Sequence, residues 1–153
     1  MANQTRKQKV VLASGVFDLL HLGHVRFLED AKKAGGKNTK LVVIVASDTT
    51  VEKMKERKPI MSEDQRCALV ESLRVVDKAV LGFENMDIGE VILEIKPDVI
   101  ALGYDQAEME KEVKTFVAKH KLRIEIVRIG KFGADNLDSS SKIKQKIVEK
   151  FSK

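Results

Sequence analysis

Short apolar runs alternate with helical patterns along almost the whole sequence, and this alternation limits the possible folds more than any other feature. The run Leu41–Ala46 is continuous and rich in β-branched residues, which is typical of a central parallel strand. Further strands are predicted at Val10–Ala13, Val75–Leu81, Val99–Leu102 and, as a half-exposed edge strand, Leu122–Ile129. Strands that alternate with helices form a parallel sheet covered on both faces. We therefore predict an α/β fold with a doubly wound parallel sheet of five to six strands.

The helical patterns fill the segments between these strands. They are predicted at Val25–Ala34, from Ser47 or Asp48 to about Glu56, after a Ser62 cap, at Ile88–Ile95, at Ala107–His120 and at Ser139–Phe151. The sequence contains no repeat and no linker, so we expect a polar tail at 1–9 and a single domain at 10–153. In such a fold, ligands bind at the carboxyl ends of the strands. Segments that follow strands are therefore the candidates for a site.

Composition excludes several classes of protein. The net charge of +5 comes from 28 basic and 23 acidic residues spread along the chain, whereas a nucleic-acid binder more often has a basic stripe with aromatics. No stretch is long and apolar enough for a membrane span, and Met1–Lys9 is too polar for a signal peptide. Cys67 is the only cysteine, which excludes an internal disulfide and a cysteine-based zinc site. We expect a cytoplasmic protein.

The segment Gly15–His24 follows the first predicted strand and leads into a helix. A helix N-terminus offers unpaired N–H groups and the positive end of the dipole, which suit phosphate. Gly23 permits close approach of a ligand, and His21 and His24 on either side of it can donate to one anionic centre. A histidine at a helix start is more often a cap or surface residue. The two histidines, Asp18 and the strand–turn–helix context together favour an anion site.

Other polar groups have two interpretations each. Lys53, Lys55, Arg57 and Lys58 form either an anion clamp or a solvated helix end, and Arg66 is either a phosphate ligand or a surface residue. Asp105 follows a buried strand and either binds a ribose hydroxyl or an amine, or caps the next helix. Ser139, Ser140 and Ser141 are either caps or a phosphate seat, and Arg128 points to the same edge.

The stretch His21-Leu22-Gly23-His24 resembles the HxGH signature of the nucleotidyltransferase superfamily. From Val10 to Phe151 the chain is similar to archaeal FAD synthases, which are FMN adenylyltransferases. The shared motifs include Lys58-Pro59-Ile60, Gln65-Arg66, Val76–Gly82 and Leu102–Gln106. Glycerol-3-phosphate cytidylyltransferases share the frame but differ near the C-terminus, where Ser139–Ser141 replace the usual Ser-Thr-Thr. Val16 also departs from the pattern, because a threonine is usual at this position.

The resemblance implies a Rossmann-like, HUP-type nucleotidyltransferase domain that transfers the adenylyl group of ATP to FMN, giving FAD and pyrophosphate. It implies a divalent cation, expected to be Mg²⁺ with few protein ligands, and a possible homodimer. Neither a nucleic acid nor a membrane is expected as a partner. The alternatives are cytidylyl or adenylyl transfer to glycerol 3-phosphate or a heptose phosphate, and a nucleotide-binding module without activity.

The resemblance also assigns site residues. The catalytic residues would be His21, His24 and Arg66, with Arg66 on the leaving pyrophosphate. The nucleotide would be bound by Val16, Phe17, His21, Leu22, Gly23, His24, Asp105, Arg128, Ser139 and Ser140, and its phosphates by Lys55 and Lys58. A flavin needs a flat apolar wall, for which we expect Phe17, Phe83, Tyr104, Phe132, Met54 and Met61, while Phe27 and Phe116 are expected in the core.

Overall fold

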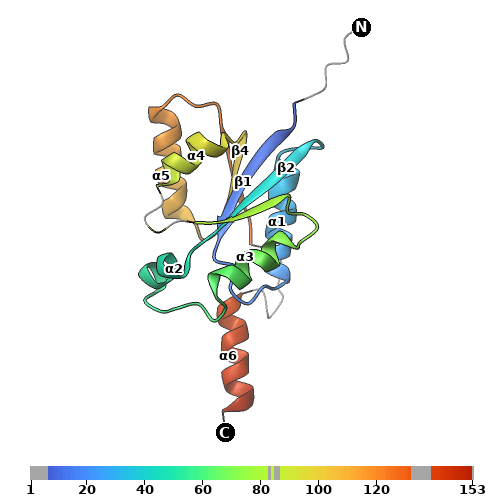
Figure 1. Ribbon diagram of the computed structural model, residues 1–153, viewed down its shortest axis with the longest axis vertical. Helices are drawn as coiled ribbons and strands as arrows, with labels where there is room; N and C mark the ends of the chain where they lie inside the picture. The colour runs from blue at the N-terminus through green and yellow to red at the C-terminus, as the bar shows by residue number, and fades with distance from the viewer. Residues whose placement is uncertain (1–6, 83, 85–86, 132–138, 153) are drawn as a thin grey trace.

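A computed structural model describes residues 7–82, 84, 87–131 and 139–152 of the chain (Figure 1). The strands are β1 (Lys9–Gly15), β2 (Thr39–Val45), β3 (Lys78–Leu81), β4 (Val99–Gly103) and β5 (Glu125–Ile129). The helices are α1 (Leu22–Ala34), α2 (Asp48–Lys55), α3 (Glu63–Glu71), α4 (Ile88–Ile95), α5 (Ala107–Lys119) and α6 (Ser140–Phe151). The strands pair in parallel in the order β3-β2-β1-β4-β5. The predicted α/β class is confirmed, with five strands in the described part of the chain.

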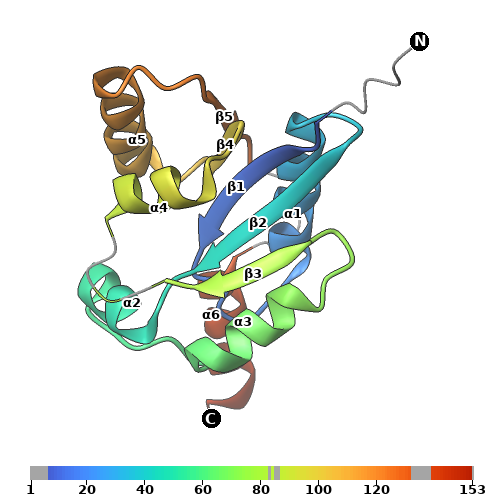
Figure 2. The same ribbon diagram turned by 45° about the horizontal axis from the view of Figure 1, so that its top comes forward.

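Helices cover both faces of the sheet, with α1 and α3 on one side and α4 and α5 on the other (Figures 1 and 2). Successive residues of a strand point to opposite faces, so the two central strands are apolar at nearly every position. On β1, Val11 and Ala13 belong to the core under α1 and α3, while Leu12 belongs to the core under α4 and α5. This arrangement is the doubly wound architecture that the alternating pattern predicts.

Two strands are shorter than predicted, because the preceding helix ends in a turn that uses their first residues. Val76 donates its N–H to the carbonyl of Leu73 at 3.0 Å, in the turn after α3. Leu122 donates its N–H to the carbonyl of Val117 at 3.0 Å and so closes the end of α5. Apolar periodicity continues through both turns, which is why the sequence pattern placed these residues in strands.

The helix α1 begins three residues earlier than predicted, at Leu22, with His21 as its N-cap residue. Gly23 and His24 therefore lie in the first turn of the helix, directly after the β1 turn. The strand order reverses between β1 and β4, and this switch point is where ligands bind in doubly wound folds.

The helix α6 projects from the body of the molecule, at the end opposite the start of β1 (Figure 1). Only its first turns approach the sheet edge. Within the residues that the structure describes, no helix combines the length and the apolar character needed to cross a membrane.

Candidate active site

A cavity of about 810 Å³ opens at the carboxyl ends of the strands, at the predicted edge of the sheet. Its volume lies toward the upper end of the range for small-molecule sites, so it has room for more than one small metabolite. Most of the predicted site residues line it, namely Val16, Phe17, His21, Gly23, His24, Lys55, Lys58, Asp105, Ser139 and Ser140. The structure thus brings together residues from both ends of the chain.

The turn after β1 has an unusual backbone. Phe17 and Leu19 adopt positive φ angles of 56° and 50°, which residues other than glycine rarely adopt. The buried ring of Phe17 folds back onto Gly15, where an added Cβ atom would lie 2.9 Å from the ring. Gly15 is therefore required by close packing. The turn sets the position from which α1 starts.

His24 is held in place by both of its neighbours in this turn. Its Nδ1 accepts a hydrogen bond from the backbone N–H of His21 at 3.2 Å. Its ring stacks on the ring of His21, with centroids 3.8 Å apart, and packs against Phe17 at 5.4 Å. Because Nδ1 accepts, a neutral His24 carries its proton on Nε2 and can donate there.

The charge state of His24 follows from its surroundings. Burial lowers its pKa to about 3, the neighbouring His21 and Lys55 lower it as well, and the carboxylate of Asp18 opposes them. His24 is therefore neutral at physiological pH. It serves the cavity as a fixed hydrogen-bond donor and not as a cation.

Asp18 connects three segments around the cavity. Its carboxylate accepts backbone N–H bonds from Ile60 and Met61, both at 2.9 Å, and pairs with Lys144 of α6 at 3.2 Å. Its carbonyl accepts from the hydroxyl of Ser140. Burial alone would raise the pKa of Asp18, but these hydrogen bonds and Lys144 lower it overall. Asp18 thus anchors the segment that follows Lys58, and it anchors α6 as well.

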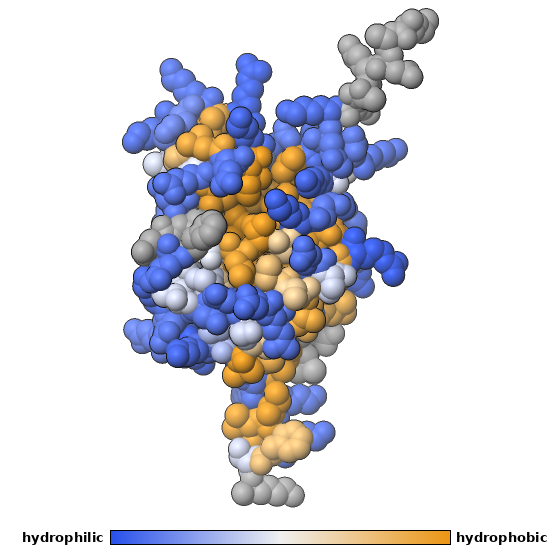
Figure 3. All heavy atoms as spheres, in the orientation of Figure 1, coloured by the Kyte–Doolittle hydropathy of each residue, from blue (hydrophilic) through white to orange (hydrophobic). Residues whose placement is uncertain are grey.

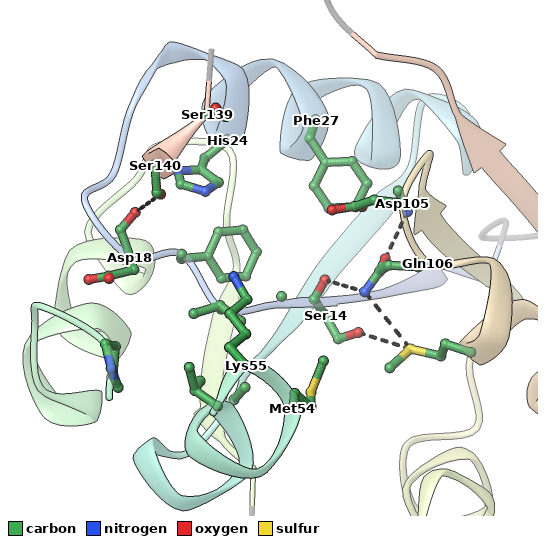
Figure 4. Close-up of a pocket in the computed structure, with 18 of the residues that line it drawn as sticks. Ser14, Asp18, His24, Phe27, Met54, Lys55, Asp105, Gln106, Ser139 and Ser140 are labelled. Atoms are coloured by element: carbon green, nitrogen blue, oxygen red, sulfur yellow. Dashed lines mark hydrogen bonds between the residues drawn. The ribbon is translucent and has the colours of Figure 1, made fainter. Parts of the chain in front are cut away.

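A basic group faces the cavity from the α2 side. Lys53, Lys55, Arg57 and Lys58 all line it. Figure 4 shows the Lys55 side chain extending from α2 into the pocket. The anion-clamp interpretation of this cluster is compatible with its position.

Arg66 is not where the sequence placed it. Its side chain has no exposed surface and does not line the cavity. Nε donates to the carbonyl of Met61 at 3.0 Å, Nη1 to the carbonyls of Val16 and Ala46 at 2.6 and 2.8 Å, and Nη2 to Asp48 at 2.7 Å. Both interpretations of Arg66, as a surface residue and as a pyrophosphate ligand, disagree with this placement. The guanidinium instead ties together the segments that form the cavity wall.

Two further predicted ligands lie outside the cavity lining. Arg128 is half exposed and donates through Nε to Glu110 on α5 at 2.7 Å, because β5 is an edge strand and alternate residues point away from the site. Leu22 is 50% exposed and points away from the pocket, since the first turn of α1 directs Gly23 and His24 inward. For both residues the predicted side-chain contact with a nucleotide is not supported.

The turn after β4 contributes Asp105 and a residue that the prediction overlooked. Gln106 accepts the N–H of Gly103 at 2.8 Å and donates to the carbonyl of Ser14 at 3.4 Å, so it bridges β4 and β1 at the switch point (Figure 4). A Cβ atom added at Gly103 would lie 3.0 Å from a carboxylate oxygen of Asp105, so a larger residue there would require that side chain to shift. Gln106 belongs to the motif Leu102–Gln106, but only its three-dimensional position shows that it forms part of the pocket floor.

The serines at the start of α6 lie where both roles that the sequence left open are compatible with their positions. Ser139 is the N-cap residue and accepts the N–H of Lys142 at 3.2 Å, which confirms the capping role. Ser139, Ser140 and Ser141 also line the cavity. Lys144 lies one turn further along α6 and lines it too, a residue that helical spacing from Ser140 could have revealed.

The apolar part of the lining differs in detail from the expectation. Tyr104 and Met54 line the cavity as predicted, but Met61 does not. Phe27, expected in the core, lines the cavity as well as packing on the core (Figure 4). Val51, Ile88 and Met109 add further apolar surface. The predicted contacts of Phe83 and Phe132 lie outside the described residues.

Comparison with known proteins decides the family. The model of the family described as cytidylyltransferase-like matches residues 12–146. The chain belongs to this family. It is 47% identical over 140 residues to an FAD synthase from Aciduliprofundum boonei, covering 92% of this chain and 91% of the relative. It is also 47% identical over 141 residues to an FAD synthase from Methanopyrus kandleri, covering 92% and 93% of the two chains. The resemblance to archaeal FAD synthases is therefore confirmed.

A solved structure supports the fold. A protein from Thermoplasma volcanium, described as a lipopolysaccharide core biosynthesis protein, superimposes with a TM-score of 0.73 and 44% identity. The match covers 82% of this chain and 98% of that one. The shared fold thus extends over nearly the whole length of that related protein.

Proposed function

We propose that this protein is an FMN adenylyltransferase that transfers the adenylyl group of ATP to FMN, releasing pyrophosphate and forming FAD. The curated relatives named FAD synthase carry the proposal, because they match over nearly their whole length. The site supports it with HxGH residues that open onto a large cavity at the carboxyl ends of the strands.

In the proposed reaction, an oxygen of the FMN phosphate attacks the α-phosphorus of ATP, and the bond to the β-phosphate oxygen breaks. Such a transfer needs reactants held in line and donors placed where charge develops. His24 offers its Nε2–H from a fixed position, and the N-terminus of α1 adds the positive end of a helix dipole. His21 lies against it at the same end of the helix. These groups stabilise the α-phosphoryl group in the transition state.

The outer phosphates of ATP have a separate set of partners. Lys55 and Lys58 carry positive charge on the cavity lining and would hold the leaving pyrophosphate. Arg66 contributes indirectly, because it fixes the carbonyls of Val16 and Ala46 in the cavity wall. We therefore assign Arg66 a positioning role.

A divalent cation, expected to be Mg²⁺, would enter as part of the ATP complex. Hard oxygen ligands from phosphates and water suit Mg²⁺, which gives up water reluctantly. The carboxylate of Asp18 is already engaged by two N–H groups and Lys144. The nucleotide itself would thus supply most of the ligands, and the cation would neutralise phosphate charge.

The apolar lining favours FMN as the acceptor. Phe27, Tyr104, Met54 and Met109 provide surface that a flat isoalloxazine ring can contact, and methionines adapt to its shape. Glycerol 3-phosphate would need hydroxyl-binding groups and no flat wall. The homodimer that the resemblance implies, and a cytoplasmic setting, remain predictions.

One assay separates the candidate activities. The purified protein is incubated with ATP or CTP, Mg²⁺ and one acceptor, and pyrophosphate release is measured with FMN, glycerol 3-phosphate or a heptose phosphate. We expect release and FAD formation with ATP and FMN. Release only with CTP and glycerol 3-phosphate would contradict the flavin assignment, and no release with any pair would favour a binding module.

A further inference from the structure

The strands all begin at the edge of the sheet opposite the cavity, where the chain enters each of them. We call this edge, with the first two residues of each strand, the amino edge; it comprises residues 7–10, 35–40, 72–79, 96–100 and 120–126. Backbone hydrogen bonds join its neighbouring segments: Lys9 donates to Asn38 at 2.9 Å, Asp98 to Val10 at 2.8 Å, Glu125 to Asp98 at 3.0 Å and Asp77 to Leu41 at 3.1 Å. The amino edge is therefore one continuous surface.

Basic residues are concentrated on the amino edge. Of the 28 basic and 23 acidic residues of the chain, nine basic and three acidic ones lie there, and 19 and 20 lie elsewhere. The edge thus holds more than the whole net charge of +5, and the rest of the chain is close to neutral. Figure 3 shows hydrophilic side chains projecting at this end of the molecule, away from α6. The nine basic residues are Lys7, Lys9, Lys37, Lys40, Arg74, Lys78, Lys96, Lys121 and Arg123.

These positive charges are open to solvent. Eight of the nine side chains are exposed, and the ninth is half-buried. No salt bridge within the described residues includes any of them. The acidic residues of the edge are already engaged in part. Asp98 accepts the N–H of Val10 at 2.8 Å. Asp77 accepts that of Leu41 at 2.7 Å and pairs with Lys32 at 2.8 Å. The edge therefore presents a positive potential to the solvent.

Helix dipoles explain only part of this concentration. Helices α1, α3, α4 and α5 end at the amino edge, and the negative end of a helix dipole stabilises cations near it. This accounts for Lys96, the C-cap residue of α4, and for Lys121, two residues beyond α5. Lys9, Lys78 and Arg123 instead lie at or just before the first residue of a strand, where the net dipole of a sheet is small. A role at helix ends therefore does not account for the whole row.

The row of strand starts is long enough to contact several phosphates. Neighbouring strands lie about 4.8 Å apart, so the five described strands span about 19 Å. Along the axis of a duplex, one backbone carries a phosphate about every 3.4 Å, so this span faces about five phosphates. Seven of the nine basic residues are lysines, whose ammonium group is a compact point charge that suits contact with phosphate oxygens.

We propose that the amino edge binds the phosphate backbone of double-stranded nucleic acid without recognising its sequence. The expectation of no nucleic-acid partner rests on charges that are spread along the sequence, whereas the fold gathers them in one row. The row lies opposite the cavity, so a bound duplex would leave the nucleotide site open. The proposal is independent of which acceptor the cavity takes.

Other anionic partners fit this surface less well. Single strands are bound largely by stacking on aromatic side chains, and the exposed Tyr and Phe side chains among the described residues, Tyr104 and Phe151, lie on other parts of the molecule. Lysine is depleted at protein–protein interfaces, which disfavours an acidic protein. A basic patch without a second anchor holds a protein only weakly at an anionic membrane.

The test measures binding of a fluorescein-labelled DNA duplex of about 20 base pairs to the full-length protein by fluorescence anisotropy, without ATP or FMN, from about 50 to 200 mM KCl. We expect a Kd of about 10⁻⁵ M or tighter at about 100 mM KCl. The logarithm of the association constant should fall with the logarithm of the salt concentration, with a slope of about −4 to −5 for about five phosphates. The single strand of the same sequence should bind more weakly.

Neutral variants locate the binding surface. Lys9→Gln, Lys37→Gln and Arg123→Gln in one chain should weaken duplex binding at least about tenfold and bring the salt slope to about −2, since each lost phosphate contact removes about 0.9. All three side chains are exposed, so circular dichroism of this variant should match that of the unaltered protein.

Two further variants serve as controls. Lys111→Gln with Lys146→Gln and Lys150→Gln is the matched control, because it removes the same charge from exposed positions on α5 and α6. Lys55→Gln with Lys58→Gln removes charge from the cavity lining. Both should leave the salt slope for the duplex unchanged.

Several results would overturn the proposal. These are no duplex binding in this salt range, tighter binding of the single strand, and an equal loss of affinity in the edge variant and the matched control. A loss confined to Lys55→Gln with Lys58→Gln would assign the duplex to the cavity instead. Binding of phosphatidylserine and phosphatidylcholine vesicles through the edge, without duplex binding, would assign the surface to a membrane. Because no substrate is present, these outcomes are separate from any test of FMN as the acceptor.

Discussion

Replacing Arg66 with leucine keeps most of the apolar stem but removes four hydrogen bonds from a fully buried guanidinium. Each hydrogen bond to a charged group contributes about 1.5–3 kcal/mol. Their effects are not additive, because they share one group, and Asp48 is 39% exposed and regains water. We therefore expect a loss of about 3–5 kcal/mol in the free energy of unfolding. This is a large part of the stability of a domain, which is typically about 5–15 kcal/mol.

Urea unfolding followed by circular dichroism measures this loss. Arg66→Lys should give an intermediate loss, because a lysine keeps the charge but cannot reach four oxygens in a planar fork. Arg74→Ala is the control, since Arg74 is exposed just after the same helix and should change stability by less than about 0.5 kcal/mol. If Arg66→Leu unfolds at the unaltered urea midpoint and changes only ATP affinity, Arg66 is a phosphate ligand and the positioning role is wrong.

The site makes further predictions. His24→Asn keeps an acceptor for the N–H of His21 but should slow FAD formation by a factor of about 10²–10³, measured by rapid quench. A near-normal rate would show that His24 takes no part in the chemical step. The pKa of His24 is about 3 when folded and near 6.5 when unfolded, so between these values the unfolded state binds more protons. Stability should fall as pH drops from about 6.5 toward 3, and urea titrations of His24→Asn should show a shallower fall. Gly15→Ala should destabilise the protein by about 1–3 kcal/mol in thermal unfolding, since its Cβ would meet Phe17; an unchanged midpoint would mean that the ring moves freely. Lys55→Ala should raise the KM for ATP more than Lys58→Ala, and equal effects would contradict the inward position of Lys55.

Local patterns were enough to predict the fold and the position of the first part of the candidate site. Each strand and helix can be predicted from the pattern of apolar and capping residues within its own segment. In Gly15–His24, the end of a strand, a turn and the start of a helix follow one another directly. The rules for doubly wound sheets then placed this segment at the ligand-binding edge. The ends of the strands were predicted less accurately. The apolar pattern includes Val75 and Leu122, which lie in the turns before β3 and β5.

The misassigned residues depend on contacts between distant segments. Arg66 is buried because the carbonyls of Val16 and Ala46, 50 and 20 residues away in sequence, converge on it. No local feature distinguishes it from an exposed arginine such as Arg74. Helical spacing places Lys144 near Ser140, but its ion pair with Asp18 joins opposite ends of the chain, and no local pattern predicts it.

For the proposed reaction, the charges around the cavity suit a polyanion at one end and a sugar at the other. Near the HxGH turn, the carboxylate of Asp18 is neutralised by N–H groups and Lys144, and that of Asp48 by Arg66. Donors and lysines therefore face the cavity there. At the far side, Asp105 lies on the lining and would repel phosphate. For the proposed reaction, this polarity orients ATP with its triphosphate toward Lys55 and its ribose hydroxyls toward Asp105, so removing the negative charge of Asp105 should weaken recognition of the nucleoside without altering the phosphoryl end.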